Sequence, residues 1–98
     1  MNQNNFNNSQ RNDLTYYYIN VKFSCSNGKS FLVCCKGDEK ICEIIQKYRN
    51  KANDYDKNRN FLFNGRDLNN NNSSLIDNGI NNGSLIKVIF QKEFNANN

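Results

Sequence analysis

Histidine and proline are absent from this 98-residue sequence. Without histidine, the chain lacks the commonest general base and the residue that most often completes a cysteine zinc site. It also contains no nucleophile elbow and no glycine-rich phosphate-binding loop. The sequence therefore predicts a protein that is not an enzyme and that uses no cofactor or metal.

Long apolar runs and clustered charge are missing as well. No stretch approaches the roughly 18 consecutive apolar residues that indicate a membrane span, and the polar N-terminus lacks the apolar segment of a secretory signal. The net charge of +4 is spread out, and its densest run, Lys47–Lys51, is typical of a solvated helix face. We therefore expect an intracellular protein, cytoplasmic and/or nuclear, that binds neither membrane nor nucleic acid.

The four cysteines do not form a metal-binding pattern. They stand at Cys25, Cys34, Cys35 and Cys42, with no Cys-x-x-Cys pair. In a reducing compartment such residues are free thiols. Alternation along the chain predicts that Cys35 points into the core and Cys34 to solvent, while Cys25 faces Lys29 across a hairpin.

Asparagine is the commonest residue and gathers in polar tracts such as Met1–Gln10 and Asn69–Asn72. Hydrophobic residues make up only 37% of the chain, which predicts a small core and modest stability. Polar ends of this composition bury too little apolar surface to fold. The predicted organisation is a disordered Asn-rich tail over 1–15, one folded domain over 16–91 and a disordered tail over 92–98.

The folded region opens with two alternating segments. In the first, the inward positions are Tyr17, Ile19, Val21 and Phe23. Asn27-Gly28 follows, a dipeptide that strongly favours a hairpin turn because both residues tolerate positive φ. Ser30 to Lys36 then alternates again, so the two segments should pair as an antiparallel hairpin.

A helix should follow the hairpin. Asp38 is a candidate cap at its start, and its end is expected near Ala52-Asn53. Its apolar stripe, at positions i, i+3, i+4 and i+7, consists of Ile41, Ile44, Ile45 and Tyr48.

Two further strands complete the pattern, over Asn60–Asn64 and Ser84–Gln91. Between them, Leu68 anchors a polar loop, and Leu75 and Ile80 flank a turn. The order β-β-α-β-β indicates an α+β fold in which one helix covers one face of a mixed sheet.

In order and spacing these segments resemble the ubiquitin family, whose fold is the β-grasp. The likeness runs from Ile19 to about Gln91 and includes the opening hairpin, the stretch Phe61–Leu68 (FLFNGRDL) and the closing stretch Ser74–Phe90. One inserted residue, among Asn69–Asn72, interrupts the register. The resemblance implies a β-grasp domain that binds other proteins.

Two departures from the family pattern are visible. No glycine follows Gly83, so the exposed Gly-Gly that conjugating relatives attach to lysine is missing. We therefore expect a non-conjugated protein. The segment Asn53–Asn58 lacks the prolines that ubiquitin has there, which predicts a looser loop.

The family's main recognition surface lies on the sheet face that the helix leaves open. Strand alternation directs Leu62 and Ile89 to that face, and the family's strand order places them side by side. Ser26 stands where ubiquitin has a third apolar residue, so the patch should be smaller. The resemblance implies a protein-binding site made of Leu62, Ile89, Lys87, Gly65 and Arg66.

A second surface is that of the small ubiquitin-like modifiers, where a partner peptide adds as a strand beside the helix. Its candidate residues are Leu32, Cys34, Lys36 and Lys47. The first hypothesis is thus an adaptor that docks through the open face, and the alternative is use of this groove. A third possibility is a structural subunit of a larger assembly, although a permanent interface should be more hydrophobic than this sequence.

Overall fold

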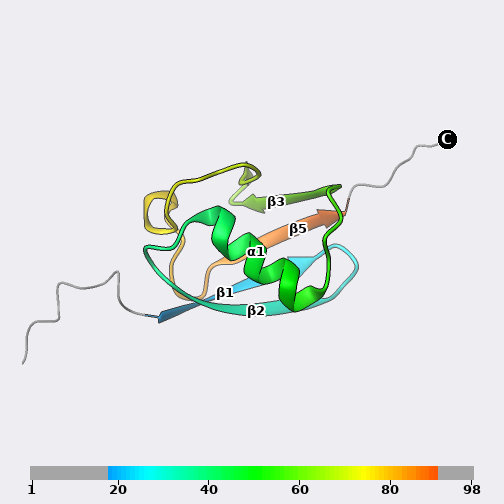
Figure 1. The fold of residues 1–98 in the computed structure, drawn as a ribbon, viewed down its shortest axis with the longest axis horizontal. Coiled ribbons are helices and arrows are strands. Elements are labelled where there is room, and N and C mark those ends of the chain that lie inside the picture. Colours follow the sequence, from blue (N-terminus) through cyan, green and yellow to red (C-terminus); the bar gives the residue numbers. More distant parts are fainter. Residues whose placement is uncertain (1–17, 91–98) are drawn as a thin grey trace, which may run out of the picture.

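The computed structural model describes residues 18–90, which form a mixed five-stranded sheet with one helix packed across one face (Figure 1). The elements are β1 (Tyr18–Cys25), β2 (Ser30–Lys36), α1 (Ile41–Ala52), β3 (Arg59–Phe63), β4 (Arg66–Asp67) and β5 (Leu85–Phe90). The predicted α+β, ubiquitin-like β-grasp fold is confirmed. The predicted tails 1–15 and 92–98, together with Tyr16, Tyr17 and Gln91, lie outside the described residues.

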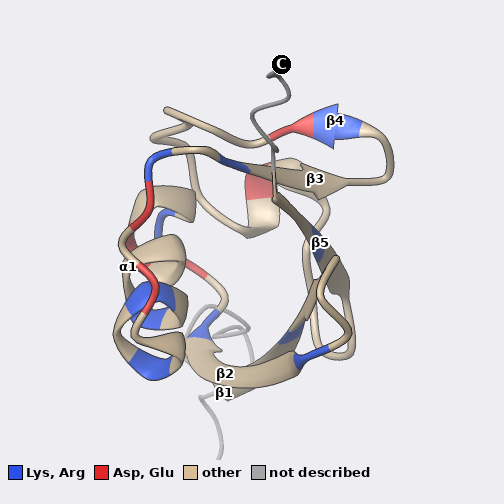
Figure 2. Ribbon diagram, turned by 90° about the vertical axis from the view of Figure 1, so that its right-hand side faces the viewer, with Lys and Arg blue, Asp and Glu red and all other residues tan. Residues whose placement is uncertain are grey.

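The strands lie in the order β2-β1-β5-β3-β4. Strands β1 and β5, which come first and last in the chain, pair in parallel at the centre, and every other pair is antiparallel. Seen at right angles to the first view, the sheet curves around α1 (Figure 2). This curvature leaves one face of the sheet turned towards the helix and the other turned away from it.

The predicted hairpin is confirmed, but its turn uses only one residue with positive φ. Gly28 has φ +94°, and its N–H donates to the Cys25 carbonyl at 2.9 Å. Asn27 instead accepts the Lys29 N–H on its side-chain oxygen at 3.0 Å. The loop is therefore one of the three-residue hairpin loops that end in a left-handed glycine.

The helix begins later than predicted. Its N-cap is Lys40, so the assignment of Asp38 as the cap is wrong. Lys40 forms a bridge with Ser74, and the Ile41 N–H donates to the Ser73 carbonyl at 2.9 Å. These contacts hold the backbone extended up to Lys40, so a distant segment determines where the helix starts.

The end of the helix is as predicted, with Asn53 as C-cap in the left-handed conformation at φ +54°. None of the helices in the described region is long and apolar enough to cross a membrane.

The core lies between α1 and the sheet. Three of the four stripe residues of α1, namely Ile41, Ile44 and Tyr48, are buried, and Ile45 is partly buried against them. Tyr48 stacks on Phe23 with ring centroids 4.9 Å apart and meets Phe61 edge-on at 5.6 Å. Such offset and edge-to-face pairs add to the stabilisation from burial itself.

The segment between β3 and β5 contains structure that the sequence did not predict, namely β4 and a 3-10 helix at Ile76–Asn78. Asn78 is buried and donates to the Ser73 hydroxyl at 2.8 Å and to the Ser74 carbonyl at 2.7 Å. Asn69 accepts the Phe61 N–H at 2.9 Å. Asparagine side chains thus replace backbone partners and hold this segment against the sheet.

Candidate functional site

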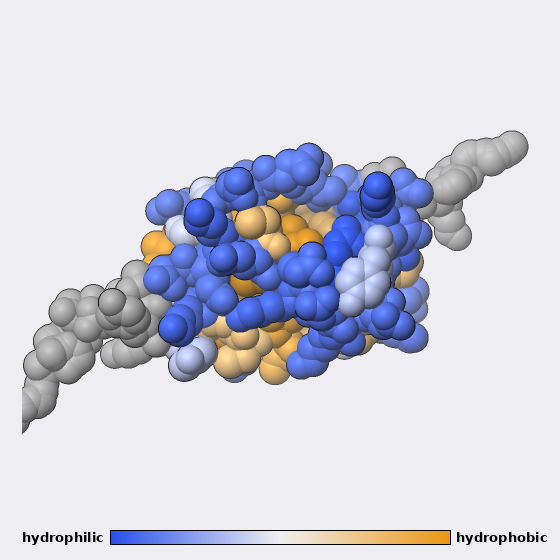
Figure 3. All heavy atoms as spheres, viewed as in Figure 1, coloured by the Kyte–Doolittle hydropathy of each residue, from blue (hydrophilic) through white to orange (hydrophobic). Residues whose placement is uncertain are grey.

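The candidate site is the face of the sheet turned away from α1, which we call the open face. Its side chains alternate with the core residues of the same strands. They are Leu32, Cys34 and Lys36 of β2, Tyr18, Asn20, Lys22 and Ser24 of β1, Leu85, Lys87 and Ile89 of β5, and Asn60 and Leu62 of β3. On the opposite side, hydrophilic residues cover most of the surface around the helix (Figure 3).

Leu62 and Ile89 occupy this face as predicted. Leu62 pairs with Lys87, and Asn60 pairs with Ile89, so Leu62 and Ile89 are diagonal neighbours across β3 and β5. Both side chains are only partly exposed, whereas Lys87 is exposed. The two apolar residues therefore contribute a shallow apolar surface, and Lys87 provides a charge next to both.

Arg66 does not belong to this surface. It pairs with Phe63, a core residue, and cross-strand partners point to the same side of a sheet. Its Nη2 donates to the Asn78 carbonyl at 3.0 Å. The residue that pairs with Leu62 is Asp67, whereas Arg66, although exposed, is directed to the Asn78 carbonyl.

Gly65 lines a hollow at one end of the open face. The hollow has a volume of about 610 Å³. It lies between the β3–β4 turn and the loop that precedes β5, and its wall residues are Leu62, Phe63, Asn64, Gly65, Gly79, Asn81, Asn82, Gly83, Ser84, Leu85 and Lys87. Three of the five predicted residues, Leu62, Gly65 and Lys87, thus meet at one concave site, whereas Ile89 does not line it.

Leu85 is a surface residue that the sequence reasoning missed. Its side chain is 42% exposed, lies on the same side of β5 as Lys87 and lines the hollow. The alternation that identified Lys87 and Ile89 as outward-facing continues one step further, to Leu85. The sequence pattern therefore also indicates that Leu85, the first residue of β5, faces outward.

The residues of the alternative groove lie on two elements that meet at Glu39, whose Oε1 accepts both the Lys36 N–H and the Lys47 ammonium at 3.0 Å. Leu32, Cys34 and Lys36 are exposed on the open face, whereas Lys47 is on α1 and binds the Glu39 carboxylate at 2.8 and 3.0 Å. The hydrogen bond that Lys47 donates to Glu39 raises the pKa of the Lys47 ammonium. Lys47 is therefore already paired within the domain.

The free edge of β2 is partly occupied by side chains of this chain. The Lys51 ammonium donates to the Leu32 carbonyl at 2.7 Å, and Glu39 accepts the Lys36 N–H at 3.0 Å. A peptide strand added at this edge would have to displace both contacts, since it needs the same backbone groups.

Cys35 lies in the core and Cys34 faces solvent, as alternation predicted, and the Cys25 N–H donates to the Lys29 carbonyl across the hairpin at 2.8 Å. Cys35 and Cys25 are buried, and Cys34 and Cys42 are exposed. Burial, with a smaller contribution from Glu39, raises the pKa of the Cys35 thiol to about 11. Because the thiolate is the reactive form, Cys35 is poorly suited to nucleophilic chemistry.

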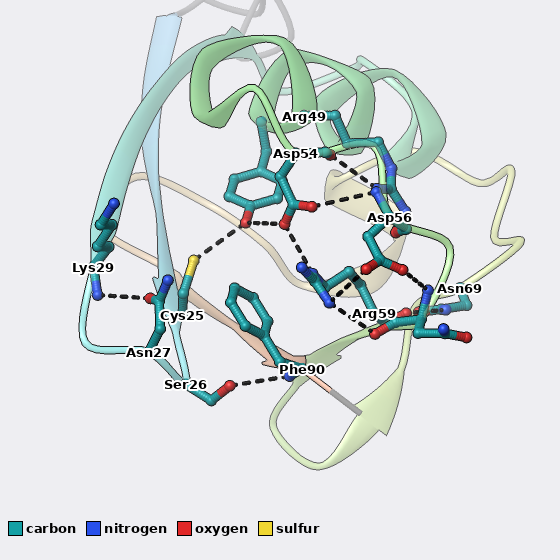
Figure 4. A network of polar contacts seen from close by, with 12 residues as sticks. Cys25, Ser26, Asn27, Lys29, Arg49, Asp54, Asp56, Arg59, Asn69 and Phe90 are labelled. Atoms are coloured by element: carbon teal, nitrogen blue, oxygen red, sulfur yellow. Dashed lines mark hydrogen bonds and ion pairs between the residues drawn. The ribbon is translucent and has the colours of Figure 1, made fainter. Parts of the chain in front are cut away.

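Cys25 belongs to a structural network at the end of the domain where the β1–β2 hairpin lies (Figure 4). Its Sγ is 3.2 Å from the Tyr48 hydroxyl, which donates to Asp54 at 3.2 Å. Arg59 completes the network with an ion pair to Asp54 at 2.8 Å. Within residues 18–90, no group of histidine, cysteine, aspartate and glutamate side chains is suited to hold a metal ion.

Solved structures of ubiquitin-like domains are similar to this chain in fold. The ubiquitin-like domain of Plasmodium falciparum Dsk2 is 21% identical, with a TM-score of 0.68, over 76% of this chain and 100% of that domain. A ubiquitin-like domain from Arabidopsis thaliana is 19% identical, with a TM-score of 0.71, over 96% of this chain and 99% of that domain. No curated protein sequence matches this one.

A family model covers most of the described region. The model described as "Ubiquitin-2 like Rad60 SUMO-like" matches residues 19–90, which reach from β1 to the end of β5. This range agrees with the limits of the β-grasp fold. The chain therefore belongs to the ubiquitin-like family of that model.

Proposed function

We propose that this ubiquitin-like domain is a non-conjugated, non-enzymatic adaptor that binds a partner protein through its open face. The observation that carries the proposal is the hollow walled by Leu62, Leu85 and Lys87. It combines apolar side chains with one exposed charge in a concave site, the combination that protein-binding anchors use.

The contacts around the hollow support a preformed binding site. The loop on one side is held by the Asn20 N–H, which donates to the Asn82 side chain at 2.8 Å, and by the Gly83 N–H, which donates to the Asn20 carbonyl at 2.8 Å. A partner side chain that enters the hollow would not need to order these walls, so less conformational entropy would be lost on binding.

The edge of β2 is the weaker candidate surface. There, a partner strand would compete with the Lys51 and Glu39 contacts before gaining any hydrogen bond of its own. The open face requires no such exchange. A structural subunit of a large assembly would bury a broader apolar area than Leu62, Ile89 and Leu85 provide.

Affinity purification from the source cells tests the proposal. The wild-type domain is compared with the double variant Leu62→Glu and Ile89→Glu, and with Lys57→Glu as a control of equal charge change at an exposed loop position. We expect specific partners to be lost with the double variant and kept with the control. Each identified partner is then purified and its affinity for the three proteins is measured.

Recovery of the same partners with all three proteins would place the interface elsewhere. In that case the double variant Glu39→Ala and Lys51→Ala tests the β2 edge directly. A ladder of covalent adducts carrying this chain, rather than non-covalent complexes, would contradict the non-conjugated reading.

A further inference from the structure

The open face extends beyond the hollow as a stripe of exposed leucines. Leu32 is 52% exposed and Leu85 42% exposed. Both are paired with the same residue of β1, Lys22, so the three side chains stand in one row across β2, β1 and β5. Leu62 and Lys87 form the next row, two residues further along β5.

The spacing of this stripe follows from the sheet. With strands about 4.8 Å apart and about 3.3 Å of rise per residue, Leu32 and Leu85 lie roughly 10 Å apart, and Leu32 and Leu62 roughly 16 Å. Lys22 stands between Leu32 and Leu85, and Lys87 lies opposite Leu62 and two residues beyond Leu85 on β5. The surface thus alternates apolar and cationic side chains across four strands.

The charge of this face has one sign over most of its area. Strands β1, β2, β3 and β5 contain no aspartate or glutamate, and the lysines on their outward side are Lys22, Lys36 and Lys87. The acid on the sheet is Asp67 of β4, at the far end beside Leu62. Lys36 is turned over the Tyr18 ring, 5.9 Å from its centroid, which leaves Lys22 and Lys87 as the charges along the stripe.

This pattern selects among possible occupants. A second copy of the chain would bring lysine against lysine, which is unfavourable at an interface. A nucleic acid would gain little from exposed leucines, because bases stack on aromatic rings. An acidic segment with apolar side chains complements both features.

From this arrangement we infer that the stripe Leu32–Leu85–Leu62 binds a segment of a partner protein in which apolar side chains alternate with aspartate or glutamate. The acidic groups pair with Lys22 and Lys87, and the apolar groups cover the three leucines. This inference rests on the proposed open-face function and adds the β2–β1 half of the sheet and the chemistry of the partner.

Selection from a phage-displayed library of random peptides tests the inference. Peptides of about 16 residues are long enough, since 16 Å corresponds to about three turns of helix. We expect the selected peptides to be enriched in acidic and apolar residues over the starting library. Replacing Leu32 and Leu85 by glutamine should weaken a selected peptide about tenfold or more, because two apolar contacts are lost.

Two controls make the result specific. A Lys57→Gln variant should bind the peptide as the wild type does. A Lys22→Gln variant should bind the peptide more weakly, and the affinity of this variant should depend less on salt concentration. Thermal unfolding of each variant shows that the domain remains folded. Selected peptides without acidic residues, no enrichment at all, or equal binding to the Leu32→Gln, Leu85→Gln variant would each overturn the inference.

Vesicles of phosphatidylserine and phosphatidylcholine provide the competing ligand. We expect the domain not to sediment with these vesicles. Binding to the vesicles without any enrichment of peptides would overturn the inference and show that the stripe binds a membrane surface.

The proposed adaptor function is tested separately. If the natural partner is lost with Leu62→Glu and Ile89→Glu but kept with Leu32→Gln and Leu85→Gln, the adaptor function stands and this extension fails. If neither double variant affects the partner, both fail.

Discussion

The Arg59 guanidinium lies 3.7 Å from the centroid of the Phe90 ring, so a residue of β3 covers the last residue of β5. The same guanidinium donates from Nε to Asp54 at 2.8 Å. Arg59 therefore links the segment after α1 to the two strands that carry most of the candidate site.

Loss of this link should destabilise the domain. Arg59→Ala leaves the partly buried Asp54 without its cation, and we expect a loss of about 2 kcal/mol in the free energy of unfolding. Chemical denaturation measures it. The exposed neighbour Lys57 provides the control, since Lys57→Ala should change stability by less than about 0.5 kcal/mol. Equal effects of the two substitutions would show that the ion pair and the ring contact contribute nothing.

Asp54 should make stability depend on acid pH. Burial alone would raise the pKa of this carboxyl, but hydrogen bonds from Arg59, the Asp56 N–H and Tyr48, with the Arg59 charge, hold the pKa below its usual range. A depressed folded-state pKa means that the stabilisation is present above the unfolded value of about 3.9 and is lost as the pH falls through the folded value.

The comparison of wild type with Asp54→Asn isolates that contribution. We expect the wild type to be more stable at pH 7 and the difference to narrow from about pH 4 downwards, as measured by urea denaturation across the pH range. A difference that stays constant down to pH 2 would contradict the assignment.

The thiols should divide into two reactivity classes. In the native protein at pH 8, a thiol reagent should modify Cys34 and Cys42 quickly, because both are exposed. Cys25 and Cys35 should react only in denaturant, since both are buried and the pKa of Cys35 is raised to about 11. Mass spectrometry gives the number of alkylated cysteines in the native protein and in the denatured protein. Fast modification of Cys35 in the native state would show that β2 opens readily.

Asn78 should be essential to the segment between β3 and β5. Asn78→Ala removes the side-chain amide that donates to the Ser73 hydroxyl and the Ser74 carbonyl. We expect the free energy of unfolding to fall by about 2 kcal/mol. Asn72→Ala, at an exposed position of the same segment, is the comparison. Thermal unfolding of both variants measures the effect. If both variants unfold at the same temperature as the wild type, the asparagine contacts do not stabilise this segment.

The double variant Leu62→Glu and Ile89→Glu should fold. Both side chains are partly exposed on the open face, so the expected cost is about 1–2 kcal/mol rather than loss of structure. Circular dichroism and a thermal scan check this before any binding experiment. If the double variant is unfolded, the prediction is wrong and the side chains of Leu62 and Ile89 contribute to the core.

Several features of the fold could be predicted because they depend on residues close in the sequence. The alternation of Ile19, Val21 and Phe23 and the helical stripe of Ile41, Ile44 and Tyr48 identify their own buried faces. The helix start could not be predicted in this way. Asp38 has the chemistry of a cap, but pairing with Ser74, far along the chain, keeps the backbone extended to Lys40.

The sequence by itself thus determined the order of the elements and the direction of most side chains, since side-chain periodicity is a local property of strands and helices. The outward positions of Leu62, Lys87 and Ile89 follow from it. Only the tertiary structure decided which of these residues meet. The registers of β3–β4 and β1–β5 place Asp67 rather than Arg66 beside Leu62 and align Leu85 with Leu32 through Lys22, because register is set by packing between segments distant in the chain.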